Sequence, residues 1–425
     1  MKMKKWLALL LAGLMTMVLL AGCGGSQQAE EPAEESGEQV TIRLMAYNNE
    51  DTRATYLALL EEKFPNIKIE YEFVPLDNFD NVATTQLQAG NGPDIFELGG
   101  ETRKFAVAGY LMDLTDEEFT GRYAQAGTSP YTVDGKVYAN PLQSWYEGIF
   151  YNKAIFEEAG VTVPHSLDEF IQLHKDLSAK GIKPQAMGAQ SWEPMMKQSI
   201  GIVNNEFYSD PANADFDSKF DKGEAKLAEA WLPYVEEWSK VISEGCLTPD
   251  MLGMSYDQAL DEFATGQAAM WECGPWAVET IMEKNPDIQL GMFPIPGLKE
   301  GTGWLVGGPG SCLAVNAKTE HWEEIKQILD FTATEEAQLA LIKDNAGSSF
   351  LTGVEVDLGD IYADCADAFK EGHVYAPWTS AWTFGNDIVE GYGKSLQEVL
   401  TGTKTVKEAL EDADAINDTQ RENAE

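Results

Sequence analysis

Hydrophobic and polar residues follow two different periods along the chain from Val40 onward. Residues 40–44 and 67–73 alternate between apolar and polar positions and predict strands, as does the short apolar stretch 94–98. Apolar residues at helical spacing over 56–64 and 77–89 predict two helices between these strands. The order β-α-β-α-β favours a mostly parallel sheet with helices on both faces.

A second series of the same kind begins near Tyr151. Ser166-Leu-Asp-Glu169 has the form of a capping box that opens a helix. We expect a long helix over 224–243 and largely helical structure after Glu320. The strands predicted in this half are 184–189, 268–272, 288–293 and 312–315. A chain of 425 residues with 44% hydrophobic composition is too long for one core, so two lobes are expected.

The first residues have the layout of a secretory signal. Three lysines precede the apolar run Trp6–Leu20, whose 15 residues are too few for a comfortable membrane span. The sequence Leu20-Ala-Gly-Cys23 then resembles a bacterial lipobox, in which the cysteine is acylated and becomes the first mature residue. We therefore predict a signal peptide over 1–22 and a lipid anchor on Cys23. The alternative is an ordinary signal peptide with a chance cysteine.

The segment that follows Cys23 is polar and rich in glutamate. It carries no bulky apolar residue, so we expect residues 23–39 to form the lipidated cysteine and a disordered acidic tether. The formal net charge of the whole chain is −40, and loss of the three signal lysines makes it more negative. Such a charge argues against nucleic acid as a partner. We expect a monomer on the outer face of a bacterial membrane, in a Gram-positive organism.

The remaining cysteines and the histidines show no metal-binding spacing. Cys246, Cys273, Cys312 and Cys365 are far apart and form no CxxC pair. They are compatible with buried thiols or with two disulfides. Neither a metal nor a cofactor is expected.

Familiar catalytic motifs are incomplete in this sequence. Gly253-Met-Ser-Tyr-Asp257 lacks the last glycine of a nucleophile elbow, and Pro309 stands where a P-loop requires lysine. HExxH is missing as well. We therefore expect a binding protein rather than an enzyme.

Aromatic residues gather with Asn, Gln and Glu where predicted strands end. In open α/β sheets ligands bind beyond the carboxyl ends of the strands. A sugar offers C–H groups to an aromatic plane and hydroxyls to polar acceptors, so this combination suits carbohydrate. Each tryptophan could instead cover its own lobe. The aromatic residues at these positions are Tyr47, Trp145, Tyr146, Trp192, Trp271, Trp276, Trp304, Trp378 and Trp382.

Several segments in a fixed order carry a family resemblance. The chain resembles the extracellular solute-binding proteins of ATP-binding-cassette sugar importers, the family that includes maltose-binding protein. The segments that match are Phe64-Pro-Asn-Ile-Lys68, Gly92-Pro-Asp-Ile-Phe96, Ala108-Gly-Tyr-Leu-Met-Asp-Leu114, Asp134-Gly-Lys-Val-Tyr-Ala139, Phe150-Tyr-Asn-Lys153, Ser166-Leu-Asp-Glu-Phe170, Gly266-Gln-Ala-Ala-Met-Trp271 and Phe293-Pro-Ile-Pro-Gly297.

The resemblance implies two α/β lobes joined by hinge crossings, with the ligand in the cleft and ABC permease subunits as partners. The implied N-terminal lobe is 40–147 plus 312–345, and the C-terminal lobe is 148–311 plus 346–425. The ligand-binding residues that it implies are Tyr47, Asn48, Asn49 and Glu97 in the first lobe, Trp145 and Tyr146 by the hinge, and Trp192, Glu193, Trp271, Trp304 and Trp382 in the second lobe.

Three functions follow from these observations. The first is capture of a mono- or oligosaccharide for import. The second is binding of a cationic ligand such as a polyamine, suggested by Glu50, Glu97, Glu101, Glu193 and Glu272 near strand ends. The third is a surface enzyme that acts on glycans.

Overall fold

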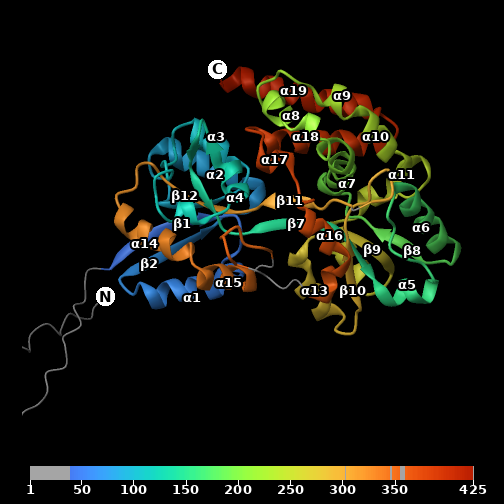
Figure 1. Ribbon diagram of the computed structural model, residues 1–425, viewed down its shortest axis with the longest axis horizontal. Coiled ribbons are helices and arrows are strands. Elements are labelled where there is room, and N and C mark those ends of the chain that lie inside the picture. The colour runs from blue at the N-terminus through green and yellow to red at the C-terminus, as the bar shows by residue number, and fades with distance from the viewer. Residues whose placement is uncertain (1–38, 302, 345–346, 355–358, 425) are drawn as a thin grey trace, which may run out of the picture. The chain divides into compact units, whose positions relative to one another are not determined.

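Two β-sheets, one in each half of the molecule, organise the part of the chain that the structure describes (Figure 1). The structure is a computed structural model that describes residues 39–301, 303–344, 347–354 and 359–424. The signal peptide, Cys23 and nearly all of the tether predicted above lie outside these residues.

The first sheet has the strand order β2-β1-β3-β12-β6. The neighbours β2, β1 and β3 are parallel, as the β-α alternation predicts, while β12 is antiparallel to both β3 and β6. The bounds are β1 Val40–Ala46, β2 Ile67–Phe73, β3 Ile95–Leu98, β6 Ala139–Pro141 and β12 Cys312–Val315. A separate two-stranded sheet pairs β4 Thr132–Val133 with β5 Lys136–Val137.

Helices cover both faces of the first sheet because successive side chains of a strand point to opposite faces. Leu44 packs toward α1, α14 and α15, whereas Met45 packs toward α2 and α3. Figure 1 shows these two groups of helices on opposite sides of the sheet. Their bounds are α1 Ala54–Lys63, α2 Leu76–Ala89, α3 Glu101–Val107, α14 Trp322–Thr332 and α15 Glu335–Asp344, with the short α4 Gln125–Thr128 nearby.

The second sheet has the order β10-β7-β9-β8, with β11 also paired to β7. Here the expectation of a mostly parallel sheet is wrong. Only β8 and β9 are parallel, because the long strand β7 runs antiparallel to β9, β10 and β11. The bounds are β7 Ser144–Asn152, β8 Lys183–Ala186, β9 Ala268–Cys273, β10 Leu290–Phe293 and β11 Val306–Pro309.

Two hydrophobic cores sandwich the second sheet. Ile149 and Met270 face the core that includes α6, α7, α18 and α19, and Phe150 and Trp271 face the core of α12 and α16. The helices of this half are α5 Lys153–Ala159, α6 Leu167–Ala179, α7 Glu193–Val203, α8 Phe216–Asp221, α12 Tyr256–Ala264, α13 Val278–Lys284, α16 Ala366–Glu371, α17 Pro377–Ser380, α18 Gly385–Leu400 and α19 Val406–Ala424.

The long helix expected over 224–243 is broken into three. These are α9 Leu227–Ala230, α10 Leu232–Trp238 and α11 Lys240–Ser243. Pro233 lies in the first turn of α10, where its missing N–H costs least, so it favours a new helix start over a continuous helix.

Two neighbouring crossings join the sheets. The chain passes from β6 to β7 and returns from β11 to β12, and Gly310 N donates to Gln143 O across the two crossings at 3.0 Å. The predicted lobe boundary at residue 346 is too early. Leu351 belongs to the core of the first sheet and forms a bridge with Tyr123, so this segment packs on the N-terminal lobe at least as far as Leu351.

The cysteine alternatives are decided for the described residues. Cys246, Cys273, Cys312 and Cys365 are all free and buried. Within the same residues, no helix combines the length and the apolar character that a membrane crossing requires.

Candidate functional site

The N-terminal side of the site is built where β1 and β3 end. Asn48 Nδ2 donates to Glu97 Oε1 at 2.5 Å, and Arg53 binds the same carboxylate through Nη2 at 2.5 Å and Nε at 3.2 Å. Arg53 and Glu97 are each 1% exposed. This two-point contact neutralises the buried carboxylate, so Glu97 acts as a structural acceptor rather than a free anion.

Tyr47 and Asn49 take different positions beside this ion pair. Tyr47 packs edge-on against Phe79, and burial raises the pKa of its hydroxyl well above the ordinary value. Asn49 is exposed, and its side chain caps the short helical turn Glu50–Arg53. Sequence reasoning missed Arg53, because nothing in its local pattern marks a buried arginine.

The C-terminal side of the site centres on Lys197 of α7. Its Nζ lies 2.5 Å from Glu147 Oε1 and 2.7 Å from Glu193 Oε2, and 5.6 Å from the centre of the Trp145 ring. Lys197 holds the pKa of Glu193 below its usual value, whereas burial raises the pKa of Glu147. Trp145 and Glu193, both predicted from sequence, are thus brought together by a lysine that was not predicted.

Glu272 lies beside this group and lacks a hydrogen-bond partner. It is opposite Ile149 in the β9–β7 pair, which places it diagonally across from Glu147 on the same face of the sheet. Both of its carboxylate oxygens are buried without a partner. Burial, followed by the charge of Glu147, raises its pKa well above the ordinary value.

Trp276 is an exposed aromatic residue at this end of β9. It is 40% exposed and follows Gly274, where an added Cβ would lie 2.0 Å from the Trp276 ring. Only glycine therefore lets the ring lie over the strand end. The ring of Tyr256, the first residue of α12, has its centre 5.3 Å from that of Trp271. The sequence places Trp276 after a strand, but its exposure was not readable there.

Three predicted ligand contacts are core residues instead, and those predictions are wrong. Tyr146 packs on Tyr362 and Phe369, Trp271 packs on Phe263, and the indole of Trp382 donates to Asp217 Oδ1 at 2.9 Å. All three are at most 2% exposed. Trp271 lies inside β9, and because both faces of this sheet are covered by helices, a residue near the strand end is still buried.

Trp192 and Trp304 are half-buried on the second lobe. Trp192 is the residue before α7, directly preceding Glu193, and its backbone packs against Gly393 of α18. Trp304 stacks on His373 with ring centres 4.6 Å apart. No contact joins Trp304 to the Lys197 group among the interactions of the described residues.

The two sides of the site meet at a hydrogen bond between lobes. Asn386 Nδ2 of α18 donates to Glu101 Oε1 of α3 at 2.8 Å. Burial raises the pKa of Glu101. The acidic residues that motivate the polyamine alternative are thus partly engaged, Glu97 by Arg53, Glu193 by Lys197 and Glu101 by Asn386.

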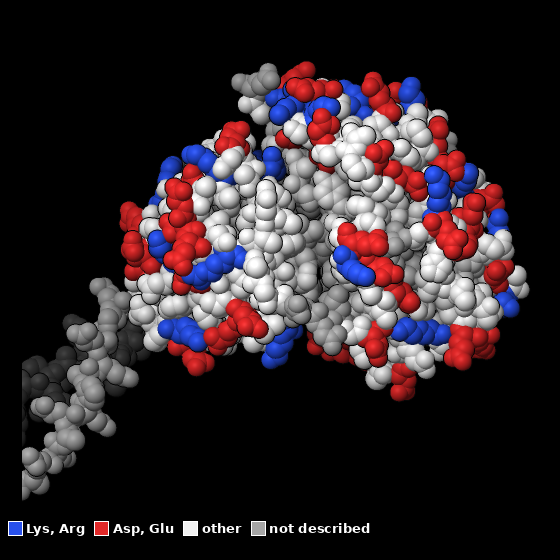
Figure 2. Space-filling model, viewed as in Figure 1, with Lys and Arg blue, Asp and Glu red and all other residues white. Residues whose placement is uncertain are grey.

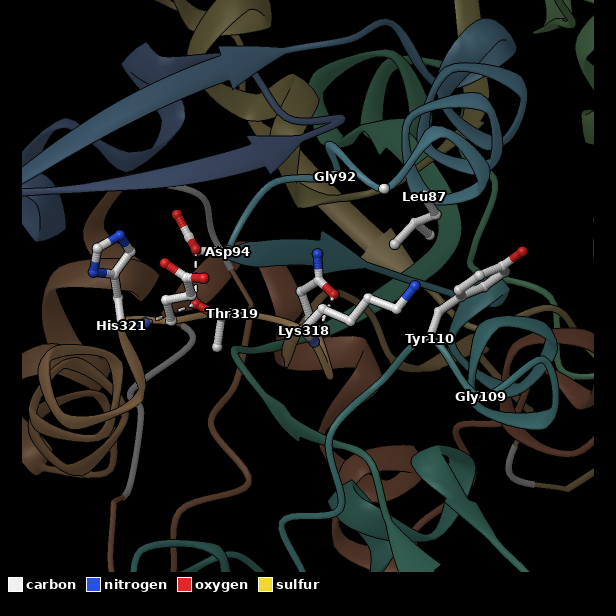
Figure 3. Close-up of a pocket in the computed structure, with 11 residues that line it drawn as sticks. Leu87, Gly92, Asp94, Gly109, Tyr110, Lys318, Thr319 and His321 are labelled. Carbon is white, nitrogen blue, oxygen red and sulfur yellow. Dashed lines mark hydrogen bonds between the residues drawn. The ribbon is translucent and has the colours of Figure 1, made fainter.

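A cavity of about 290 Å³ lies elsewhere, at the opposite end of β3 (Figure 3). Asp94, Tyr110, Asn316, Lys318 and His321 are among its lining residues. Asp94 lies just before the start of β3, whereas the predicted ligand site lies at the other end of this strand. Thr319 Oγ1 donates to Asp94 Oδ1 at 2.7 Å, so this carboxylate holds the loop together. In the described residues no group of three or more His, Cys, Asp or Glu is placed to hold a metal ion.

Residues 48–339 match the family model described as bacterial extracellular solute-binding protein. The chain belongs to this family. The match includes both crossings, the Arg53–Glu97 pair, the Lys197 group and, except for β1, the strands of both sheets. The fold expected from the resemblance, two lobes that each contain a sheet, is confirmed by the structure and by the solved structures that resemble it.

Curated relatives cover most of the chain. The multiple sugar-binding protein of Streptococcus mutans is 26% identical over 363 residues, which are 81% of this chain and 82% of that protein. The diacetylchitobiose binding protein DasA of Streptomyces coelicolor is 28% identical over 361 residues, 81% of each protein.

Among solved structures, the solute-binding protein RafE in complex with raffinose has a TM-score of 0.70 at 24% identity, and the alignment covers 90% of this chain and 100% of that one. A family 1 extracellular solute-binding protein from Bifidobacterium longum subsp. infantis has a TM-score of 0.75 at 22% identity, covering 90% of this chain and 100% of that one.

Proposed function

We propose that this protein captures an oligosaccharide between its two lobes and delivers it to the membrane subunits of an ABC importer. The observation that carries the proposal is the exposed ring of Trp276, which follows the end of β9, on the same lobe in which Glu147 of the adjoining strand β7 and Glu193 of α7 hold Lys197. An aromatic plane with fixed charged acceptors next to it suits the C–H face and the hydroxyl rim of a sugar ring.

The ion pairs that the carboxylates already form favour a sugar over a cationic ligand. Glu97 is bound by Arg53 and Glu193 by Lys197, so each already has a positive partner. A polyamine would have to displace these partners, whereas sugar hydroxyls can donate to the remaining lone pairs of Glu193, whose side chain is 39% exposed.

The relatives support the same class of ligand. A multiple sugar-binding protein and a diacetylchitobiose binding protein are among them, and RafE was solved with raffinose. We accordingly propose Tyr47, Asn48, Trp145, Trp192, Glu193 and Trp276 as the ligand-facing residues, with Asn49 and Trp304 at the margin of the site.

Membrane attachment completes the proposed role. The signal at 1–22 would direct export, and acylation of Cys23 would hold the domain at the outer face of the membrane. The domain would bind and release its sugar without changing it chemically.

A thermal-shift screen tests this function. A ligand that binds only the folded protein raises the melting temperature, and above its Kd the stabilisation grows with the logarithm of the ligand concentration divided by Kd. Residues 39–425 would be screened with raffinose, stachyose, diacetylchitobiose, maltotriose and spermidine. We expect an increase with at least one of the sugars and none with spermidine. A shift with spermidine alone would contradict the proposal, and so would release of smaller sugars from any of these oligosaccharides.

A further inference from the structure

We infer that Lys197 is a positioning residue for ligand binding, which holds Trp145 and Glu193 in place from behind the ligand-facing surface. This inference rests on the proposed function. Trp145 belongs to β7 and Glu193 to the first turn of α7, so they come from elements far apart in sequence. Lys197 contacts both.

The ion pairs of Lys197 fix the orientation of its side chain. Its side chain is 12% exposed, and its ammonium donates to Glu147 Oε1 and Glu193 Oε2. The carboxylate of Glu147 is almost fully buried and belongs to the central strand of the second sheet. It therefore anchors the ammonium firmly, while Glu193, at 39% side-chain exposure, keeps one edge toward solvent and the ligand.

The charges around Lys197 make this arrangement depend on it. Three carboxyl groups surround the ammonium, those of Glu147 of β7, Glu193 of α7 and Glu272 of β9. Lys197 forms an ion pair with the first two. Tyr256 of α12 and Cys273 of β9 lie near Glu147 and stay uncharged at neutral pH. Without Lys197, Glu147 and Glu193 would lose their opposite charge, and Glu193 would turn toward water.

The cation also steadies the Trp145 ring. An ammonium 5.6 Å from the ring centre is within the range of cation–π attraction. Trp378 packs on the same ring, with centres 5.8 Å apart. Loss of Lys197 would remove this attraction and leave Trp378 as the aromatic partner of the ring.

The test compares three variants of residues 39–425 by titration calorimetry with raffinose. Lys197→Met removes the charge and keeps much of the stem, Lys197→Arg keeps the charge, and Lys175→Met removes a lysine whose partner is the exposed Glu244 on the same lobe. We expect affinity for raffinose to fall at least about tenfold in Lys197→Met, to fall no more than about threefold in Lys197→Arg and to stay unchanged in Lys175→Met. A tenfold loss corresponds to about 1.4 kcal/mol.

The dependence of sugar affinity on pH shows whether Lys197 positions the ligand-binding residues or only stabilises the fold. In Lys197→Met the pKa values of Glu193 and Glu147 should both rise, because the cation that favours their ionised forms is gone. As the pH is lowered, affinity should therefore decline at a higher pH in the folded variant than in the wild type. A residue that only stabilised the fold would change the melting temperature and leave this profile unmoved.

A crystal structure of ligand-free Lys197→Met gives an answer that does not depend on the sugar. We expect the Glu193 carboxylate and the Trp145 ring to leave their present positions. Unchanged positions, or wild-type affinity for raffinose, would overturn the inference. If no sugar in the screen binds the wild type, the proposed function fails, and the ligand-free structure still decides the role of Lys197.

A second variant protects the test if Lys197→Met does not fold. Glu147→Gln keeps the shape of the side chain and weakens the hold on the ammonium. It should lower raffinose affinity by at least about threefold while Lys175→Met does not, and wild-type affinity in Glu147→Gln would overturn the inference.

Discussion

Trp271 and Trp276 lie five residues apart and face opposite environments. Trp271 is 2% exposed and packs among the rings beside α12, whereas Trp276 is 40% exposed beyond the end of the strand. At the scale of single residues, exposure rather than residue type decides which aromatic residue can meet a ligand. The sequence predicts that tryptophans gather at strand ends, but it carries no signal for whether both faces of a sheet are covered.

The two tryptophans should therefore fail in different ways when replaced by alanine. Trp276→Ala should weaken sugar binding about tenfold or more, because loss of a stacking plane costs on the order of 1–3 kcal/mol by analogy with base stacking. Its melting temperature should barely move. Trp271→Ala should lose about 3–5 kcal/mol of stability. Calorimetry measures the affinity for sugar, and urea unfolding measures the stability. A stable Trp271→Ala that binds sugar weakly, together with an unstable Trp276→Ala that binds it normally, would refute the site.

Glu272 makes stability depend on pH through one buried carboxyl. Burial raises its pKa, so the folded protein keeps this proton to a higher pH than the unfolded chain does. As the pH rises from the ordinary carboxyl pKa to the raised one, the unfolded state loses the proton first and the free energy of unfolding falls. Each pH unit in this window costs at most about 1.4 kcal/mol.

Glu272→Gln cannot ionise and should escape this loss. Its free energy of unfolding should exceed that of the wild type at pH 7 by about 1 kcal/mol or more, and the two proteins should converge as the pH falls below the ordinary carboxyl pKa. Urea unfolding at pH 7 and pH 4 measures the difference. Glu236→Gln, at an exposed position, is the control. A variant no more stable than the wild type at pH 7 would mean that Glu272 has a partner in solution.

At the scale of elements, the local sequence pattern predicted most strands and helices of the first lobe. It did not predict which distant segments pair. Residues 40–44, 67–73 and 94–98 correspond to β1, β2 and β3. The pairing of β7 with β11 joins segments far apart in the chain, and no local period encodes such a contact. The same holds for Lys197, which reaches Glu147 only after α7 packs on the second sheet.

The β7–β11 pair depends on a glycine. A Cβ at Gly307 would lie 2.3 Å from the Trp145 carbonyl oxygen and 2.7 Å from Tyr146 Cα, which are backbone atoms that cannot move without parting the strands. Gly307→Ala should destabilise the protein by about 1–3 kcal/mol, as overpacking does. Gly121→Ala, where an added Cβ meets nothing within 4 Å, should change stability little. Chemical unfolding compares the stability of the two variants. If they were equally stable, β7 and β11 could move apart at this position without cost, and the prediction would be wrong.

At the scale of the whole molecule, each lobe has its own hydrophobic cores. Charged residues of both signs are spread over the visible face of both lobes without a block of one sign (Figure 2). The contacts that join the lobes include the two crossings beside Gly310 and the hydrogen bond from Asn386 to Glu101. A molecule built in this way can rotate one lobe on the other while the cores of both lobes stay intact.

Small-angle X-ray scattering of residues 39–425 tests most directly whether sugar is captured between the lobes. A ligand that contacts both lobes binds the closed arrangement better and shifts the population toward it. We predict a smaller radius of gyration at saturation with a sugar that calorimetry shows to bind, relative to the same protein without it. An unchanged radius of gyration at saturation would contradict capture by closure and would place the bound sugar on one lobe alone.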